Sequence, residues 1–166
     1  MRRACTFATA LGRIQLVWTP DGICGLRFVQ GLPAREDKTA PAWVLEAIRR
    51  LMAHLIGRPE DLSTIPVDLT DLTPFQRRVA EVLRATRPGA TISYGEVALL
   101  AGRPGAARAV GQAVKANPVL ILVPCHRVVA AAGPGGWSAF GTPERKARLL
   151  ALESPHTGPD DSPPPR

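Results

Sequence analysis

Residues 119–127 read VLILVPCHR, five apolar side chains followed by a proline, a cysteine, a histidine and an arginine. An apolar run of this length between two prolines is typical of a buried strand, so we expect a strand over Val119–Val123. That strand would end directly before Cys125 and His126. The residue types that can carry chemistry therefore follow immediately on a segment of the core.

Cys125 has the surroundings of a reactive cysteine. A cysteine is a nucleophile only as the thiolate, and a neighbouring base or positive charge favours that form. His126 follows it directly and Arg127 comes next. Adjacent side chains often diverge, so a water molecule could bridge the thiol and the imidazole. The alternative is a buried cysteine that only packs after an apolar strand, and the pattern alone leaves both open.

Three short helices are expected before this segment. Two of them begin with capping boxes. In a capping box, the side chain of a Ser or Thr and the side chain of the third residue after it each accept a hydrogen bond from the other residue's backbone N–H. The capping pairs are Thr73 with Gln76 and Ser93 with Glu96. The third helix is expected over Ala106–Ala116, after a Pro-Gly turn at residues 104–105. Two short helices across such a turn outline a helix-turn-helix.

Arg108, Gln112 and Lys115 lie on one face of this third helix, at positions i, i+4 and i+7. Its other residues are mostly alanine and glycine, which make the helix thin. A thin helix lets its backbone approach another surface closely, and a basic stripe suits phosphates. The alternative is that the small residues pack against a neighbouring helix while the stripe faces water.

The first 72 residues have a different character. Their pattern predicts three strands and one helix, over Cys5–Ala10, Arg13–Thr19, Ile23–Val29 and Ala42–Ile56. Residues 66–69 could add one more strand. Cys5 and Cys24 are expected in the core, and His54 is interpreted as incidental. Downstream of Cys125, a final helix is expected from Thr142 to about Glu153, followed by a Pro-rich tail at 154–166 that we expect to be disordered.

Composition narrows the class of protein. The chain has 166 residues, 45% of them apolar, and a net charge of +7. Residues 73–153 carry eleven Lys or Arg against four Asp or Glu, whereas residues 1–72 carry nine against eight. This excess on one half suggests a polyanionic partner, although a solvated Arg-rich surface would look the same. The sequence shows neither a membrane-spanning segment nor a secretory signal, and its three cysteines form no disulfide framework.

Together these motifs resemble the O6-alkylguanine-DNA alkyltransferase family, also called methylated-DNA–protein-cysteine methyltransferases. The resemblance is densest in ISYGEVA at 92–98, in AARAVG at 106–111 and from Asn117 through PCHRVV at 124–129. It covers roughly residues 73–153, and the first 72 residues agree in layout more than in letters. The loop at 137–141 departs from many members, which leaves the size of the accepted alkyl group open.

The resemblance implies a reaction and a role for each residue. The family flips an O6-alkylated guanine out of the duplex, and a cysteine takes the alkyl group by direct displacement without being regenerated. By resemblance, Cys125 is the acceptor, His126 is the general base acting through a water, and Glu153 orients His126. Tyr94 presses on the 3′ phosphate and donates to the leaving guanine. Asn117 braces the turn before the active-site strand.

The resemblance also implies how DNA is bound. The DNA-contacting residues are Arg108, which fills the space of the flipped base, together with Tyr94, Ala107, Gln112 and Lys115. The substrate pocket is formed by Val114, Val128, Trp137 and Ser138. The partner is double-stranded DNA containing O6-alkylguanine, bound through the minor groove by a monomer. No cofactor, metal or membrane is expected, because residues 1–53 contain no histidine to complete a zinc site with Cys5 and Cys24.

We therefore expect an α/β protein in two parts and a tail. Residues 1–72 form a small RNase H-like sheet-plus-helix domain, residues 73–153 a mostly helical, winged-helix-like domain with the DNA-binding and active sites, and 154–166 the tail. The expected location is the cytoplasm, in association with the nucleoid if the source is bacterial. The alternative function is a non-catalytic DNA-damage-binding or regulatory protein on the same scaffold. An unrelated Cys–His hydrolase would not explain the basic helix-turn-helix.

Overall fold

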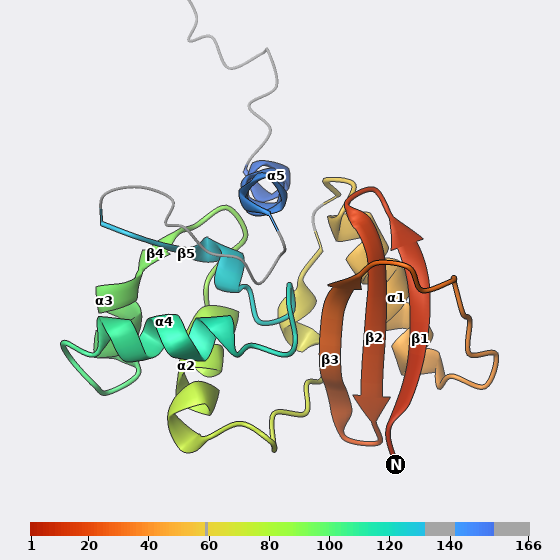
Figure 1. The fold of residues 1–166 in the computed structure, drawn as a ribbon, viewed down its shortest axis with the longest axis horizontal. Coiled ribbons are helices and arrows are strands. Elements are labelled where there is room, and N and C mark those ends of the chain that lie inside the picture. Colours follow the sequence, from red (N-terminus) through yellow and green to blue (C-terminus); the bar gives the residue numbers. More distant parts are fainter. Residues whose placement is uncertain (59, 132–141, 155–166) are drawn as a thin grey trace, which may run out of the picture.

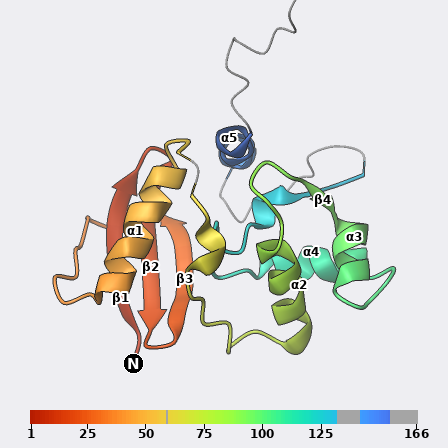
Figure 2. The same ribbon diagram turned by 180° about the vertical axis from the view of Figure 1, so that it is seen from behind.

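The computed structural model describes residues 1–58, 60–131 and 142–154. The N-terminal half is a three-stranded antiparallel sheet in the order β1-β2-β3, with one helix, α1, packed across one of its faces (Figures 1 and 2). The elements are β1 (Arg3–Thr9), β2 (Gly12–Thr19), β3 (Gly22–Val29) and α1 (Ala42–His54). The three strands and the helix predicted for this half are confirmed to within a few residues at their ends.

Alternation along the strands explains why α1 covers this sheet. In β2, Ile14, Leu16 and Trp18 are buried while the residues between them are only partly covered. Side chains alternate between the two faces of a strand, so this period of two places the apolar set on the side facing α1. The helix buries its own stripe, which consists of Val44, Ala47, Leu51 and His54. The stripe recurs every three or four residues, as a helix with one buried face requires.

The C-terminal half is mostly helical and lies beside the sheet (Figure 1). Its elements are η1 (Leu62–Thr64), α2 (Pro74–Arg84), β4 (Ile92–Ser93), α3 (Tyr94–Leu100), α4 (Ala107–Lys115), η2 (Cys125–Arg127), β5 (Val128–Val129) and α5 (Pro143–Glu153). β4 and β5 pair in parallel. Both predicted capping boxes are present, with Thr73 opening α2 and Ser93 opening α3. The predicted helices at 106–116 and 142–153 are confirmed as α4 and α5.

The segment Val119–Val123 is buried, but the strand predicted there is wrong. Only Val119 bridges to a neighbouring strand, at Leu26. The chain then turns tightly, because the Leu122 N–H donates to the Leu120 carbonyl at 2.8 Å and the Ile121 φ is 73°. A positive φ is strained for a β-branched residue, and an i to i+2 hydrogen bond defines a γ-turn. The apolar run therefore fills the core as a turn and brings the chain into η2.

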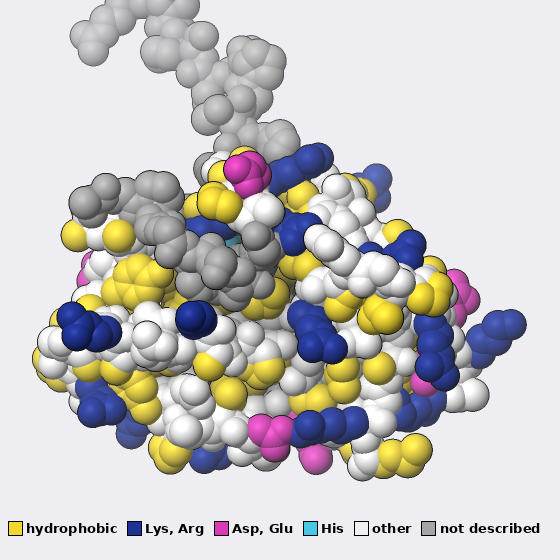
Figure 3. All heavy atoms as spheres, viewed as in Figure 1, with side chains coloured by type: hydrophobic (Ala, Val, Ile, Leu, Met, Phe, Trp, Pro, Cys, Tyr) yellow, Lys and Arg dark blue, Asp and Glu magenta, His cyan; other side chains and the backbone are white. Residues whose placement is uncertain are grey.

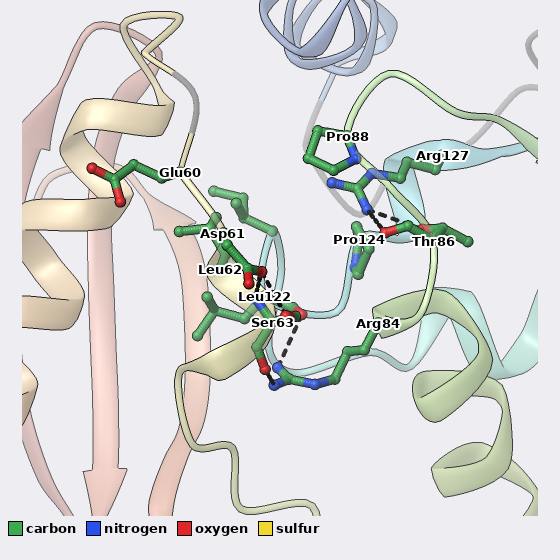
Figure 4. A pocket seen from close by; sticks show the side chains of 11 residues that line it. Glu60, Asp61, Leu62, Ser63, Arg84, Thr86, Pro88, Leu122, Pro124 and Arg127 are labelled. Carbon is green, nitrogen blue, oxygen red and sulfur yellow. Dashed lines mark hydrogen bonds between the residues drawn. The ribbon is translucent and has the colours of Figure 1, made fainter.

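The two halves share one continuous apolar core. Arg84 of α2 donates to backbone carbonyls of Ser63, Ile65 and Leu122 at 2.6–3.2 Å, and so links η1 to the γ-turn. Figure 4 shows Arg84 and Arg127 beside a small cavity between the halves. Its volume of about 30 Å³ is enough for roughly one water molecule and far too small for a nucleobase.

Three remaining expectations have mixed outcomes. The possible strand at 66–69 is a single bridge from Val67 to Ile23. Cys5 lies in the core as predicted, but Cys24 is only half-buried and lines a surface groove, so that prediction is wrong. Trp137, Ser138 and nearly all of the tail lie outside the described residues.

In the part of the chain that is described, no helix is both long and apolar enough to cross a membrane.

Candidate active site and nucleic-acid interface

Cys125 begins the short helix η2 and is 1% exposed. Asn117, just after α4, holds it in place. The Asn117 side-chain amide donates to Cys125 Sγ and to the Val123 carbonyl, each at 3.0 Å, and its carbonyl accepts from the Val119 N–H at 3.0 Å. One side chain thus closes the turn before η2 and also touches the thiol directly.

Burial dominates the proton affinity of this thiol. It raises the pKa of Cys125 to about 12, because a thiolate loses its hydration there. The hydrogen bond from Asn117 and the positive charge of Lys146 act in the opposite direction. Lys146 is buried in α5 and donates to the Val128 carbonyl at 2.8 Å. At neutral pH the resting group is therefore the thiol, and it needs a base to become a nucleophile.

The carboxylate of Glu153 gathers three side chains around it, and we call the four residues His54, His126, Arg127 and Glu153 the Glu153 network. His126 Nε2 lies 2.8 Å from Glu153 Oε1. Arg127 donates to both oxygens of Glu153, from Nε and from Nη2, at 2.9 Å each. All four residues are buried. A carboxylate only accepts hydrogen bonds, so His126 must present its Nε2–H to Glu153 and keep Nδ1 as its basic nitrogen.

Burial and hydrogen bonding oppose each other within the Glu153 network. Burial alone would raise the pKa of Glu153, but the hydrogen bonds from His126, His54 and Arg127 hold that pKa well below its usual range. Burial lowers the pKa of His126, although Glu153 favours its charged form. Together these shifts give an ionised carboxylate beside a neutral imidazole, the arrangement needed for a base that accepts a proton during reaction.

His54 is the functional candidate that the sequence did not reveal, because we interpreted it as incidental. The structure corrects this: His54 in the last turn of α1 is 5% exposed, and its Nε2 lies 3.0 Å from Glu153 Oε1. The one available signal was its place on the buried stripe of that helix. The two residues are 99 positions apart. Arg127 was noted only as a nearby charge, and its bond to Glu153 was also missed.

Tyr94 lies at the start of α3, next to α4. It is partly buried. This burial raises the pKa of its phenol, and the nearby Cys125 raises it further. A Cβ added at Gly111 of α4 would lie 3.9 Å from the Tyr94 ring. The predicted catalytic residues Cys125, His126 and Asn117 are brought close to one another, and a thiolate at Cys125 would disfavour ionisation of the Tyr94 phenol.

The polar stripe predicted on α4 is exposed. We call Arg108, Gln112 and Lys115 the α4 stripe, and all three side chains face solvent. Arg and Lys side chains are spaced over this face of the molecule (Figure 3). Among the described residues, neither Arg108 nor Lys115 forms an ion pair. The alanines within α4 are half-buried or buried, which agrees with the alternative that the small residues pack inward while the stripe faces solvent.

The predicted pocket residues can be placed only in part. Val114 of α4 and Val128 of β5 are both buried, at 1% and 0% exposure. Trp137 and Ser138 lie outside the described residues. Within the described ranges, no group of three or more His, Cys, Asp or Glu side chains is placed to hold a metal ion.

Fold and site together define a class of protein. A buried cysteine is held beside a histidine that a carboxylate orients, and a helix pair next to it presents exposed cations to solvent. That combination belongs to a nucleic-acid-binding protein with a cysteine nucleophile. Residues 74–155 match the family described as 6-O-methylguanine DNA methyltransferase, DNA binding domain.

Similarity to known proteins extends over nearly the whole chain. The methylated-DNA–protein-cysteine methyltransferase of Mycolicibacterium paratuberculosis is 39% identical, over 92% of each chain. The Mycobacterium tuberculosis O6-methylguanine methyltransferase has a similar structure, with a TM-score of 0.77 and 32% identity over 96% of this chain and 97% of that one. Mycobacterium tuberculosis OGT in complex with DNA superposes with a TM-score of 0.75 and 35% identity, covering 89% and 90%. The chain belongs to the methylated-DNA–protein-cysteine methyltransferase family.

Proposed function

We propose that this protein repairs DNA by transferring an alkyl group from O6-alkylguanine to its own Cys125. The hydrogen-bonded group of Asn117, Cys125, His126 and Glu153 carries this proposal, because it supplies a thiol, a neutral base and a carboxylate that orients the base. The family and the DNA-bound relative support the same assignment. The cysteine is not regenerated in the family, so each molecule acts once.

The steps of alkyl transfer follow from the protonation states of Cys125, His126 and Glu153. His126 takes the Cys125 proton through a bridging water, and Glu153 stabilises the imidazolium that forms. The Sγ–carbon bond then forms as the carbon–O6 bond breaks, and the electron pair of that bond goes to the guanine. Tyr94 donates a proton to the leaving guanine and later recovers one from the imidazolium. The thiol can therefore have a high pKa in the resting protein, because it loses its proton only when the substrate is bound and reacting.

Access to the base requires DNA to be bound and opened. A guanine inside the stack is out of reach of a buried thiol, so it must be flipped. We infer that Arg108 enters the space left by the base, and that Ala107, Gln112 and Lys115 contact the flanking phosphates with Tyr94. A helix of small residues suits the minor groove, which is only about 6 Å wide. Val114, Val128, Trp137 and Ser138 would line the pocket that receives the base.

We take the sheet with α1 as a reduced RNase H-like domain over residues 1–72, and α3, α4, β4 and β5 as the winged-helix-like part of a domain over 73–153. The protein would act as a monomer in the cytoplasm, associated with the nucleoid if the source is bacterial. It would need no cofactor, because the thiol itself is the acceptor.

The direct test measures the mass of the intact protein after incubation with a duplex that contains O6-methylguanine. The expected result is a gain of one methyl group per molecule, mapped to Cys125 and absent from Cys125→Ser. The serine variant should still bind the duplex, because Cys125 lies beneath the surface that would contact DNA. Tight binding by the wild type without a change in mass would instead indicate a non-catalytic damage-binding protein.

A further inference from the structure

Two histidines from different halves of the molecule contact one oxygen atom. Glu153 Oε1 lies 2.8 Å from His126 Nε2 and 3.0 Å from His54 Nε2. His126 belongs to η2, beside the thiol, whereas His54 belongs to the last turn of α1 beneath the sheet. Both imidazoles and the carboxylate are nine-tenths or more buried. The proposed general base therefore shares its carboxylate with a second imidazole.

Hydrogen-bond chemistry sets the state of these groups. The carboxylate can only accept, so both imidazoles direct an Nε2–H at Oε1. Arg127 adds a donor to each oxygen and balances the negative charge, and the Gly89 N–H approaches Oε2 at 3.5 Å. With that charge already balanced, another positive charge at this buried position would be costly. A neutral His126 is the resting state that satisfies these constraints.

We propose that His54 is a positioning residue for alkyl transfer, which holds Glu153 Oε1 with a second N–H and so keeps His126 neutral and able to accept the thiol proton. The inference rests on the proposed function, because it assigns His54 to the same reaction. Each donor that occupies Oε1 spreads the negative charge over more partners. Oε1 then draws less strongly on the proton held by His126.

Removing the His54 donor should therefore make His126 easier to protonate. The titratable and charged groups that face the carboxylate are His54 from α1, and His126 and Arg127 from η2. Without His54, the charge of Glu153 is shared only between His126 and Arg127, which favours the imidazolium. A base that is already protonated cannot take the thiol proton. Reaction should then fail at a pH where the wild-type protein still reacts.

The experiment compares rate constants for transfer from free O6-benzylguanine between pH 5 and pH 9. The free base is used so that DNA binding does not enter the measurement. His54→Leu removes the donor at similar volume, whereas His54→Gln keeps an N–H near the same position without an ionisable group. For His54→Leu we expect the midpoint of the acid limb to move upward by about one pH unit, the size of one hydrogen bond to a charged group. Below both midpoints the rate would then be roughly tenfold lower.

Two controls separate positioning from packing. Val44→Ala removes buried volume from the same helix without touching Glu153, so it should lower the melting temperature and leave the midpoint unchanged. His54→Asn has an amide one bond shorter than Gln, which should not reach Oε1, and it replaces His54→Leu if that variant does not fold. The expected pattern is a wild-type midpoint for His54→Gln and a raised midpoint for the donor-free variants.

Three outcomes would overturn the inference. The first is a wild-type midpoint in the donor-free variants, and the second is an equal shift in His54→Gln, which would assign the effect to lost packing or entry of water. The third is a wild-type protein that gains neither a benzyl group from the free base nor a methyl group from a duplex containing O6-methylguanine, at any pH. That last result would overturn the proposed function together with this inference, whereas the first two would leave the proposed function intact.

Discussion

The Glu153 network and the α4 stripe both concentrate charge, but they do so in opposite environments. In the network, Arg127 is 5% exposed and bonded to both oxygens of its partner. On the stripe, Arg108 and Lys115 face solvent, and within the described residues neither has an ionic partner. Part of the network follows the stripe closely in the chain, since α4 ends at Lys115 and η2, which holds His126 and Arg127, begins at Cys125.

This difference separates two tasks. A buried charge must be compensated within the protein, and its fixed partners can then set the protonation state of a reacting group. An exposed and uncompensated cation keeps its charge available for a polyanion, and contributes most at low salt. The network is therefore suited to chemistry and the stripe to binding. Substitutions in the two regions should differ in size and in the property that they change.

The largest effect is expected for Glu153→Gln. The variant leaves Arg127 buried without a counter-charge, and breaking a buried pair in this way costs about 3–5 kcal/mol. The measurement is the free energy of unfolding in urea. Glu96→Gln is the matched control, because Glu96 lies in the exposed capping box of α3 and a glutamine can replace it there. A Glu153→Gln protein as stable as the control would show that the network is not what stabilises this part of the fold.

The same variant also sharpens the expected dependence on pH. The folded pKa of Glu153 is held below its usual range, so its contribution to stability is present above the unfolded value of about 4.3 and is lost as the pH falls below it. Wild-type stability should therefore begin to fall below about pH 5 and keep falling as the pH drops further, and Glu153→Gln should fall less. Parallel pH curves for the two proteins would contradict the assignment.

Arg108→Ala should act on DNA and not on chemistry. If Arg108 fills the space of the flipped base, its loss should slow repair in a duplex by roughly 10- to 100-fold, since unstacking a base costs a few kcal/mol. Reaction with free O6-benzylguanine should change little. Arg148→Ala, an exposed position on α5, removes the same charge elsewhere and serves as the control. Equal losses on both substrates would argue against the assigned role.

Lys115→Gln is expected to have a smaller effect, seen in the salt dependence of binding. Each phosphate contact contributes about 0.9 to the slope of log affinity against log salt. The slope for a duplex should therefore become shallower by about that amount. Arg58→Gln makes the same change of charge on the other half of the molecule and should leave the slope as it is. Identical slopes in wild type and Lys115→Gln would place the phosphates elsewhere.

The smallest effect is expected for Gly111→Ala, and its two parts should have opposite signs. Among the described residues the added Cβ would meet only the Tyr94 ring, at 3.9 Å, so the helix should gain about 0.5–1 kcal/mol of stability. The same methyl group thickens α4 and should weaken duplex binding slightly if this face enters the minor groove. Thermal unfolding and duplex affinity measure the two parts. Stronger binding by the variant would count against that docking mode.

Local signals explain which parts of the fold could be predicted from the sequence. Thr73 and Ser93 open their helices through contacts three residues away, and the alternation in β2 needs only its own side chains. The strand predicted at Val119–Val123 failed because an apolar run reports burial and not backbone shape. The positive φ of Ile121 depends on the surrounding core, and no residue type in the run indicates it.

The residues of the site likewise fall into those that the sequence identified and those that only the structure shows. Cys125 and His126 are adjacent in the chain and could be identified by their motif, and Glu153 could be added by resemblance. The contact of His54 with Glu153 joins residues 99 positions apart, and only the packing of α1 against the C-terminal half brings them together. A contact over this separation leaves no local pattern in the sequence. It also connects the N-terminal half of the molecule directly to the active site in the other half.

The position of Glu153 also has a consequence for biosynthesis. It lies at the end of the last helix, 27 residues after His126, so ribosomes making roughly 5–20 residues per second complete the thiol and its base before the carboxylate. A chain still being made can fold its sheet and capped helices, but it lacks the group that orients the base. A protein whose cysteine can be used only once would thus acquire its reactivity last, when the final helix docks.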